Sequence, residues 1–167
     1  MNKPKVLTHL LVDDGAIPNN ARLPLLLYPG VLKGESKDEV RRCILSNDWQ
    51  GAWIGSVYSF HHYHSTAHEV LGCFQGSAKV QFGGESGPVI VIQAGDGVVI
   101  PAGVGHKSLS ASSDFSVIGA YPPGQDVDMC EENEDSKDAI MTRIENLPVP
   151  KTDPFTGRSG PLWDLWN

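Results

Sequence analysis

The chain has 167 residues and a mass of 18.1 kDa, enough for one domain with a buried core. Hydrophobic residues make up 40% and charged residues 20%, which are globular values and exclude wholesale disorder. The formal net charge of −7 and the pI near 5.2 leave no broad basic face, and this argues against a nucleic-acid partner.

Two leucine- and valine-rich runs near the N-terminus, residues 5–12 and 23–28, predict strands, because turn-forming residues lie between them. Ser36 then predicts the start of a short helix. Glu39, three residues later, completes a capping box, and we expect the helix to end near Asn47.

The central stretch, 53–121, alternates short apolar runs with glycine-bearing turns. Such spacing predicts a sandwich or barrel, and no alternation of strands and helices is present. The clearest strands are rich in β-branched and aromatic residues: Val80–Phe82, Val89–Ile92 and Val98–Ile100.

The C-terminal part of the chain has three sections. The acidic stretch 131–135 predicts a solvated surface, and residues 137–145 predict a second short helix. The last twenty residues hold four prolines and lack regular periodicity, but they end with Trp163 and Trp166. Because tryptophans are seldom left in solvent, we expect this tail to pack over the barrel or onto a second subunit.

A cluster of histidines carries the clearest chemistry. His62 and His64 lie two residues apart, so in a strand they project from the same face. Four residues then leave room for a turn that returns Glu69 beside them. Imidazole and carboxylate ligands together suit Mn, Fe, Co, Ni, Cu or Zn better than calcium or magnesium, although such a cluster can also arise by accident.

A second segment strengthens the case. The chain carries two spaced motifs, His62-x-His64-x4-Glu69-x6-Gly76 and Gly95-x5-Pro101-x-Gly103-x2-His106. Together they resemble both signatures of the cupin superfamily. Ser110 stands where the second signature has an asparagine that is not a ligand. The flanking sequences 60–72 and 119–125 also resemble the narrower group of YjlB-like cupins.

The resemblance implies an all-β fold, a single double-stranded β-helix (cupin or jelly-roll) barrel, and the two short helices predicted above flank it. We expect one domain over 1–167, with a barrel core at about 53–121, N-terminal strands and helix at 5–47, and a C-terminal helix and tail at 122–167. Carried over by position, the ligands of one divalent transition metal are His62, His64, Glu69 and His106.

Four protein ligands leave one or two positions open on a five- or six-coordinate metal, which is typical of a working site. We therefore expect a metal-dependent enzyme for a small polar molecule, with oxygenase chemistry ahead of isomerase chemistry, and Glu69 as its catalytic proton shuttle. Two alternatives stay open: a non-catalytic module that binds a small molecule or metal, and a structural or storage role. Fold alone does not choose between them.

Strand alternation suggests further residues near the metal. Tyr58 and Phe60 share the parity of the two histidines, so we expect them to line the barrel, as core packing or as substrate contacts. Cys73 shares the parity of Glu69 and is expected to point inward, as a core residue or as a thiol near the metal. Tyr121 is expected at the pocket mouth or in the core.

The same alternation turns His61 and His68 toward the outer face, where we expect surface or subunit-contact roles. Single-barrel cupins commonly pair, so we expect a homodimer through the N-terminal strands and the tryptophan-bearing tail.

The cysteine pattern and the apolar runs bear on location. Three widely separated cysteines without a Cys-x-x-Cys pair fit a reducing compartment. No apolar run reaches the roughly 20 residues of a membrane helix, and no signal-peptide core forms at the N-terminus. We expect a cytoplasmic protein with no membrane partner.

Overall fold

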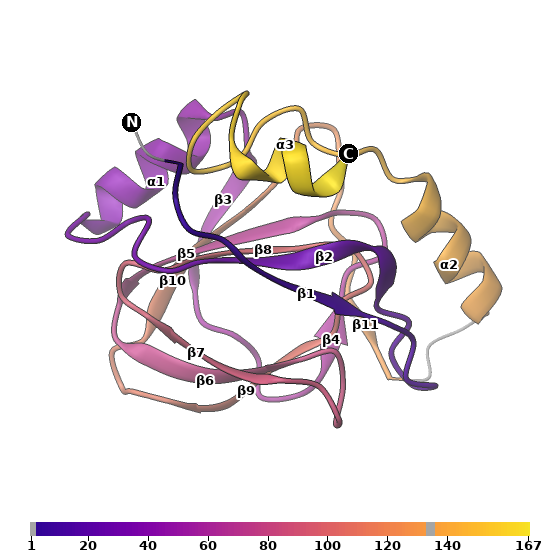
Figure 1. The fold of residues 1–167 in the computed structure, drawn as a ribbon. Coiled ribbons are helices and arrows are strands. Elements are labelled where there is room, and N and C mark those ends of the chain that lie inside the picture. Colours follow the sequence, from indigo (N-terminus) through magenta and orange to yellow (C-terminus); the bar gives the residue numbers. More distant parts are fainter. Residues whose placement is uncertain (1–2, 133–135) are drawn as a thin grey trace.

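A computed structural model describes residues 3–132 and 136–167. Its strands form two antiparallel sheets that face each other, so the expected all-β jelly-roll fold is confirmed (Figure 1). The six-stranded sheet has the order β1-β2-β8-β5-β10-β3, and the five-stranded sheet has the order β11-β4-β9-β6-β7. The strands of the first sheet are β1 Leu7–Leu11, β2 Asn20–Tyr28, β3 Gln50–Gly55, β5 Glu69–Gln75, β8 Gly97–Ile100 and β10 Ser116–Tyr121. Those of the second are β4 His62–Tyr63, β6 Ser77–Phe82, β7 Val89–Gln93, β9 His106–Ala111 and β11 Cys130–Glu131.

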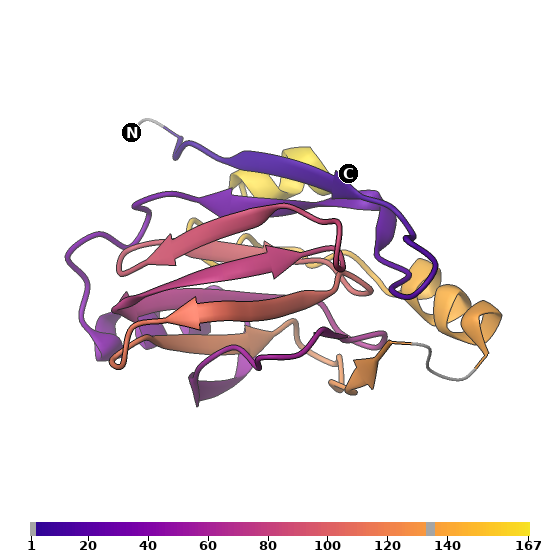
Figure 2. The ribbon, with the colours of Figure 1, turned by 90° about the horizontal axis from the view of Figure 1, so that it is seen from below.

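The sheets extend beyond the barrel core predicted at 53–121. Strand β2 pairs with β8 inside the six-stranded sheet, and β11 pairs with β4 at the edge of the other sheet. Figure 2 shows the five-stranded sheet from below. The closely spaced glycine turns mark only the central strands, so the sequence pattern alone did not place the outer strands in the sheets.

The described residues contain the two predicted helices, α1 (Lys37–Ser46) and α2 (Lys137–Asn146), and a third, α3 (Pro161–Trp166). The capping box of α1 is present, since Glu39 N–H donates to Ser36 Oγ and Ser36 N–H donates to the Glu39 carboxylate. With 10 residues each, α1 and α2 have about half the length of a membrane-spanning helix, and the described part of the chain holds no longer one.

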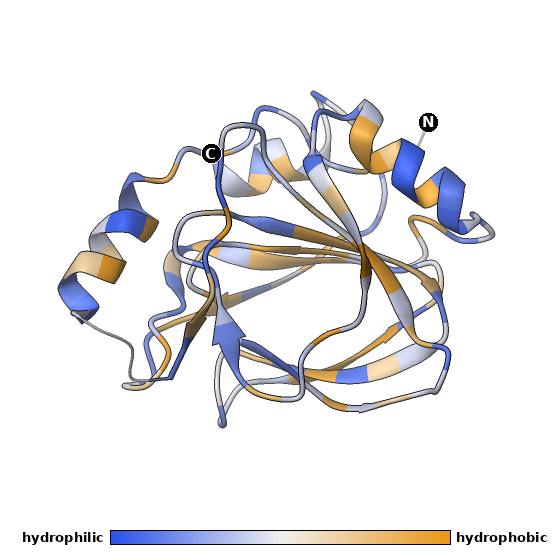
Figure 3. Cartoon of the chain, turned by 180° about the vertical axis from the view of Figure 1, so that it is seen from behind, coloured by the Kyte–Doolittle hydropathy of each residue, from blue (hydrophilic) through white to orange (hydrophobic). Residues whose placement is uncertain are grey.

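The four central strands of the six-stranded sheet, β2, β8, β5 and β10, are buried on both faces, which explains their nearly continuous apolar runs. Figure 3 shows the hydrophobic colouring along the strands. Along β2, Leu25 and Leu27 point into the core between the sheets, while Leu26 and Tyr28 point to the opposite face. Helices α1 and α3 cover that opposite face (Figure 1). Gly72 permits the close approach of α1, because a Cβ there would lie 2.7 Å from Val40 Cγ1.

The C-terminal tail packs on its own chain, which is one of the two alternatives left by the sequence. Trp166 is buried, and its Nε1–H donates to the carbonyl oxygen of Pro24 over 2.9 Å. Before α3, the buried Asp153 carboxylate accepts a hydrogen bond of 2.7 Å from Tyr28 Oη. Helix α3 itself was not predicted. It is short, so it shows little periodicity, and the prolines of the tail obscure the pattern further. In the acidic stretch, residues 131 and 132 are exposed as expected, while 133–135 lie outside the described residues.

Candidate metal centre

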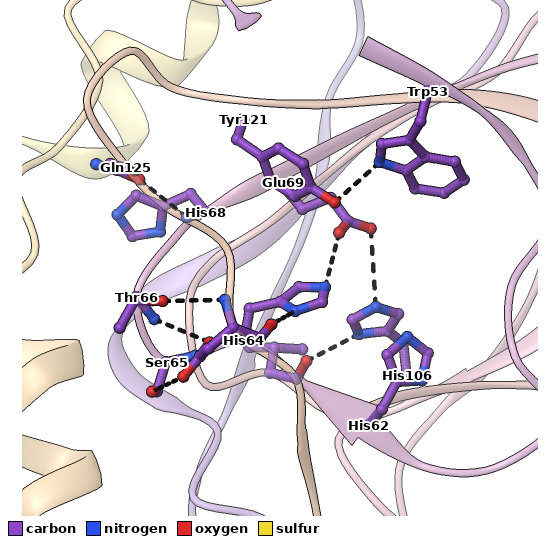
Figure 4. A network of polar contacts seen from close by, with 12 residues as sticks. Trp53, His62, His64, Ser65, Thr66, His68, Glu69, His106, Tyr121 and Gln125 are labelled. Atoms are coloured by element: carbon purple, nitrogen blue, oxygen red, sulfur yellow. Dashed lines mark hydrogen bonds and ion pairs between the residues drawn. The ribbon is translucent and has the colours of Figure 1, made fainter. Parts of the chain in front are cut away.

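Three histidines converge between the two sheets. His62 on β4 pairs directly with His106 at the start of β9, and His64 follows β4 by one residue. One ring nitrogen from each lies within 4.8 Å of those of the other two, and all three side chains are buried (Figure 4). This arrangement can hold a metal ion.

The opposite ring nitrogen of each histidine is fixed by the main chain. A carbonyl oxygen only accepts, so each Nδ1 carries a hydrogen. The Nε2 atoms of His62 and His106 therefore keep a lone pair for another partner, whereas Nε2 of His64 donates to the Glu69 carboxylate at 2.7 Å and must give up that hydrogen to bind a metal. Backbone contacts of this kind orient metal-binding imidazoles. The Nδ1 contacts are His62 to Phe60 O at 3.1 Å, His64 to Asp128 O at 2.6 Å, and His106 to Val104 O at 3.0 Å.

Glu69, the first residue of β5, reaches the histidines from the six-stranded sheet. Its Oε2 lies 2.7 Å from His64 Nε2, and its Oε1 lies 3.8 Å from His106 Nε2. The structure thus brings all four sequence-predicted ligands together. The ring nitrogens of the three histidines form the compact set, with the carboxylate beside two of them (Figure 4).

Burial and the neighbouring carboxylate set the charge of the imidazoles. Burial lowers the pKa of His62, and it lowers that of His106 far more, aided by the nearby His62. For His64 burial also acts downward, but the hydrogen bond and charge of Glu69 outweigh it and leave the pKa above its ordinary value. Two imidazoles are therefore held neutral, as metal binding requires.

The donor set fits a transition metal. His106 Nε2 is buried and has no hydrogen-bond partner, a condition that is costly unless a ligand occupies that direction. Three imidazoles and one carboxylate suit Mn, Fe, Co, Ni, Cu or Zn.

The four residues form the floor of a cavity of about 390 Å³, within the usual range for small-molecule sites. Tyr121 lies in its wall, and its hydroxyl accepts a hydrogen bond of 2.9 Å from Trp53 Nε1. The residues lining the cavity are Trp53, Ile54, Gly55, Ser56, Val57, Tyr58, His62, His64, Glu69, His106, Tyr121 and Met129.

The predicted pocket residues divide between the cavity and other places. Tyr58 and Tyr121 line the cavity, whereas Phe60 does not, although its ring stacks on Tyr58 with centroids 5.1 Å apart. Tyr58 is 54% exposed but lines the cavity, in agreement with its expected place in the pocket. Phe60 is 41% exposed and lies outside the cavity lining, because the chain before β4 is not a strand and does not follow strand alternation. Cys73 is fully buried in the core between the sheets and outside the cavity lining.

The surface roles predicted for His61 and His68 also need correction. His68 does face away from the cavity, but it is fully buried, because α3 covers that face and places Trp166 with ring centroids 4.9 Å away. Its Nδ1 accepts a hydrogen bond of 2.9 Å from Ala102 N–H. His61 is 5% exposed, and its Nε2 lies 3.3 Å from the Glu85 carboxylate.

The contributors to the site that were missed from the sequence include Trp53, Asp128 and Met129. Trp53 and Met129 line the cavity, and Asp128 holds His64. An aromatic residue at the edge of the central apolar stretch was a usable signal for Trp53. No local pattern marks Asp128 or Met129, which precede β11 in an irregular segment.

Comparisons with known proteins place the chain in a family. No protein-family model matches it. The uncharacterized protein YjlB of Bacillus subtilis (strain 168) is 44% identical over 159 residues, which cover 95% of this chain and 95% of that protein.

Likenesses to solved structures are weak. DMSP lyase DddQ from Ruegeria pomeroyi DSS-3 superposes with a TM-score of 0.39 and 14% identity, over 81% of this chain and 54% of that one. Procruciferin, an 11S globulin from Brassica napus, gives a TM-score of 0.39 and 16% identity, over 66% of this chain and 23% of that one. The match thus spans about half of the first protein and a quarter of the second, and neither likeness transfers an activity. The extended match with YjlB, on a two-sheet jelly roll that carries both motifs, shows that the chain belongs to the YjlB-like cupins.

Proposed function

We propose that the chain binds one divalent transition metal through His62, His64, His106 and Glu69 and uses it as an enzyme on a small molecule. The observation that carries this proposal is the convergence of three ring nitrogens whose opposite nitrogens all contact backbone carbonyls. A site oriented in this way before the metal arrives favours binding, because little side-chain freedom remains to be lost.

The chemistry follows from the residues of the cavity floor. A divalent metal there supplies Lewis-acid polarisation of a substrate oxygen, or redox chemistry with dioxygen if the metal is iron, manganese or copper. Glu69 is the carboxylate beside the ligand nitrogens, and we propose it as the group that moves a proton to or from the substrate.

The test is elemental analysis of protein purified without oxygen, beside a His62→Ala/His106→Ala double variant. A matched control is His9→Ala, which removes a histidine from β1, away from the cavity lining. About one equivalent of metal in the wild type and in the control, absent from a folded double variant, supports the site. A folded wild type that holds no metal even after reconstitution contradicts it.

The metal found then directs the search for turnover. Iron calls for oxygen-uptake assays first, with Glu69→Gln as the variant that should keep metal and lose turnover. Tight ligand binding without turnover for any candidate favours the alternative, a non-catalytic binding module.

We also propose a homodimer in a reducing, cytoplasmic setting. Three apolar side chains of the edge strand β1 and the residue after it are exposed, Leu7, Leu10 and Val12, at 43%, 55% and 62%. An exposed apolar edge of this kind favours pairing with a second chain. All three cysteines are thiols rather than disulfides, which supports the reducing compartment.

A further inference from the structure

The cavity has a polar floor and an apolar rim. His62, His64, His106 and Glu69 at the floor are each no more than 7% exposed. At the rim, Ile54, Tyr58 and Met129 line the same cavity and are 56%, 54% and 48% exposed. Apolar groups gathered around a polar site mark the surface that a ligand covers.

The rim is partly aromatic and partly adaptable. The ring of Tyr58 stacks on Phe60, and both rings meet His62 edge-on, with centroids 5.2 and 5.7 Å away. Met129, which lines the same cavity, offers a flexible thioether that packs well against aromatic groups. A flat apolar body placed between these side chains contacts both the floor and the rim.

The charges of the cavity-lining residues limit the negative charge that the polar end of the ligand can carry. Among its lining residues, all of which the structure describes, there is no lysine or arginine, and the carboxylate of Glu69 is the one formal charge. A divalent metal bound beside this carboxylate would bring the summed formal charge of the cavity to +1. Lys107, the residue after His106, is held outside by Glu85, with 3.2 Å between Nζ and Oε1. A phosphate dianion in this cavity finds no side-chain cation to pair with.

We propose that the ligand of this cavity is amphipathic, with an oxygen-bearing head of at most one negative charge on the histidine floor and an apolar or aromatic body against Ile54, Tyr58 and Met129. The inference rests on the proposed metal site, and it adds the class of molecule that the site accepts. Phosphosugars and other phosphate esters are excluded from that class.

Three probes with the same hydroxycarboxylate head test it: glycolate without a body, mandelate with a phenyl ring, and 3-phosphoglycerate with a phosphate. Titration calorimetry on protein loaded with nickel(II), a probe that stays divalent in air, gives the affinities, and metal content is measured before and after. We expect mandelate to bind at least about tenfold more tightly than glycolate, and 3-phosphoglycerate no more tightly than glycolate.

Two variants test whether the preference for mandelate over glycolate comes from the rim residues. In protein that holds one equivalent of nickel, Tyr58→Ser should remove most of the gain of mandelate over glycolate. Val91→Ser is the matched control, because Val91 is 55% exposed on β7 and does not line the cavity. This variant should keep the full gain.

The outcomes separate the two proposals. Stoichiometric nickel with equal affinities for mandelate and glycolate, or with preference for 3-phosphoglycerate, overturns the amphipathic ligand and leaves the metal site standing. The same holds if Tyr58→Ser keeps the gain. Failure of the folded protein to hold nickel overturns both.

Discussion

The Nδ1 atom of His64 lies 2.6 Å from the backbone carbonyl oxygen of Asp128, a residue 64 positions further along the chain. The carboxylate of Asp128 in turn accepts hydrogen bonds from Ser65 N–H at 2.7 Å, from Ser65 Oγ, and from Thr66 N–H at 3.3 Å. These bonds hold the segment before β11 beside His64, and the same segment carries Met129, which lines the cavity.

Replacing Asp128 should weaken metal binding without removing a ligand. In Asp128→Ala the carboxylate clamp is lost, so the carbonyl that orients His64 is no longer held in place. Loss of such outer contacts costs roughly 10- to 100-fold in metal affinity, and competition with a chromophoric chelator measures it. Asp126→Ala, an exposed change in the same segment, should have no effect. Equal metal affinities for the two variants would show that the hydrogen bonds of the Asp128 carboxylate do not help to orient His64.

Glu69→Gln should shift the titration of His64. In the metal-free protein the Glu69 carboxylate raises the pKa of His64 against the effect of burial, so the neutral amide should let this pKa fall. Because protons compete with metal for Nε2, wild-type affinity should decline as the pH falls through the His64 pKa, and in Glu69→Gln the decline should begin at lower pH. NMR titration of the imidazole protons measures the pKa. A His64 pKa that is the same in both proteins would contradict the inference that the Glu69 carboxylate raises it.

His68 should make the fold sensitive to acid. Burial lowers its pKa from 6.5 to about 3, so the unfolded chain binds this proton below pH 6.5 and the folded chain does not. Stability is therefore complete above pH 6.5 and is lost progressively down to about pH 3, with a loss of about 2 kcal/mol at pH 5. Urea unfolding at pH 7 and pH 5, with a chelator present, should show a smaller drop for His68→Gln than for the wild type. Identical drops would mean that His68 takes up its proton without unfolding.

Gly119→Ala should disturb the cavity wall from the neighbouring strand. A Cβ at this position on β10 would lie 2.1 Å from Cε2 of Trp53, so the indole must move and its hydrogen bond to Tyr121 must break. We expect a loss of about 1–3 kcal/mol in the free energy of unfolding, as for other overpacked sites. The double variant Gly119→Ala/Trp53→Leu should recover part of it. If the double variant is as unstable as the sum of the single changes, the clash is not the cause.

The proposed dimer should depend on the edge strand β1. Leu10→Lys places a charge on the exposed apolar edge and should yield monomers, which sedimentation velocity detects. Val91→Lys, equally exposed on the other sheet, should leave the dimer intact. A wild type that sediments as a monomer at every concentration removes the basis for the dimer.

Local patterns in the sequence were enough for the main strands, the capped helix and the grouping of the four predicted ligands. Period-two alternation and turn residues act over a few positions, so Val98–Ile100 and the capping box of α1 were readable directly. His62, His64, Glu69 and His106 were found because their spacing matches two family motifs.

The surroundings of these ligands were decided by contacts between distant segments. His68 has the parity of an outward residue, and only the packing of α3, about 100 positions later, buries it under Trp166. Asp128 has no local signature, yet it reaches His64 because β11 pairs with β4. By itself the sequence determined the central strands and the choice of predicted ligands, because periodicity and motif spacing are local properties. Tertiary structure alone decided what orients the ligands and what covers each face, because burial depends on segments that pack together from distant parts of the chain.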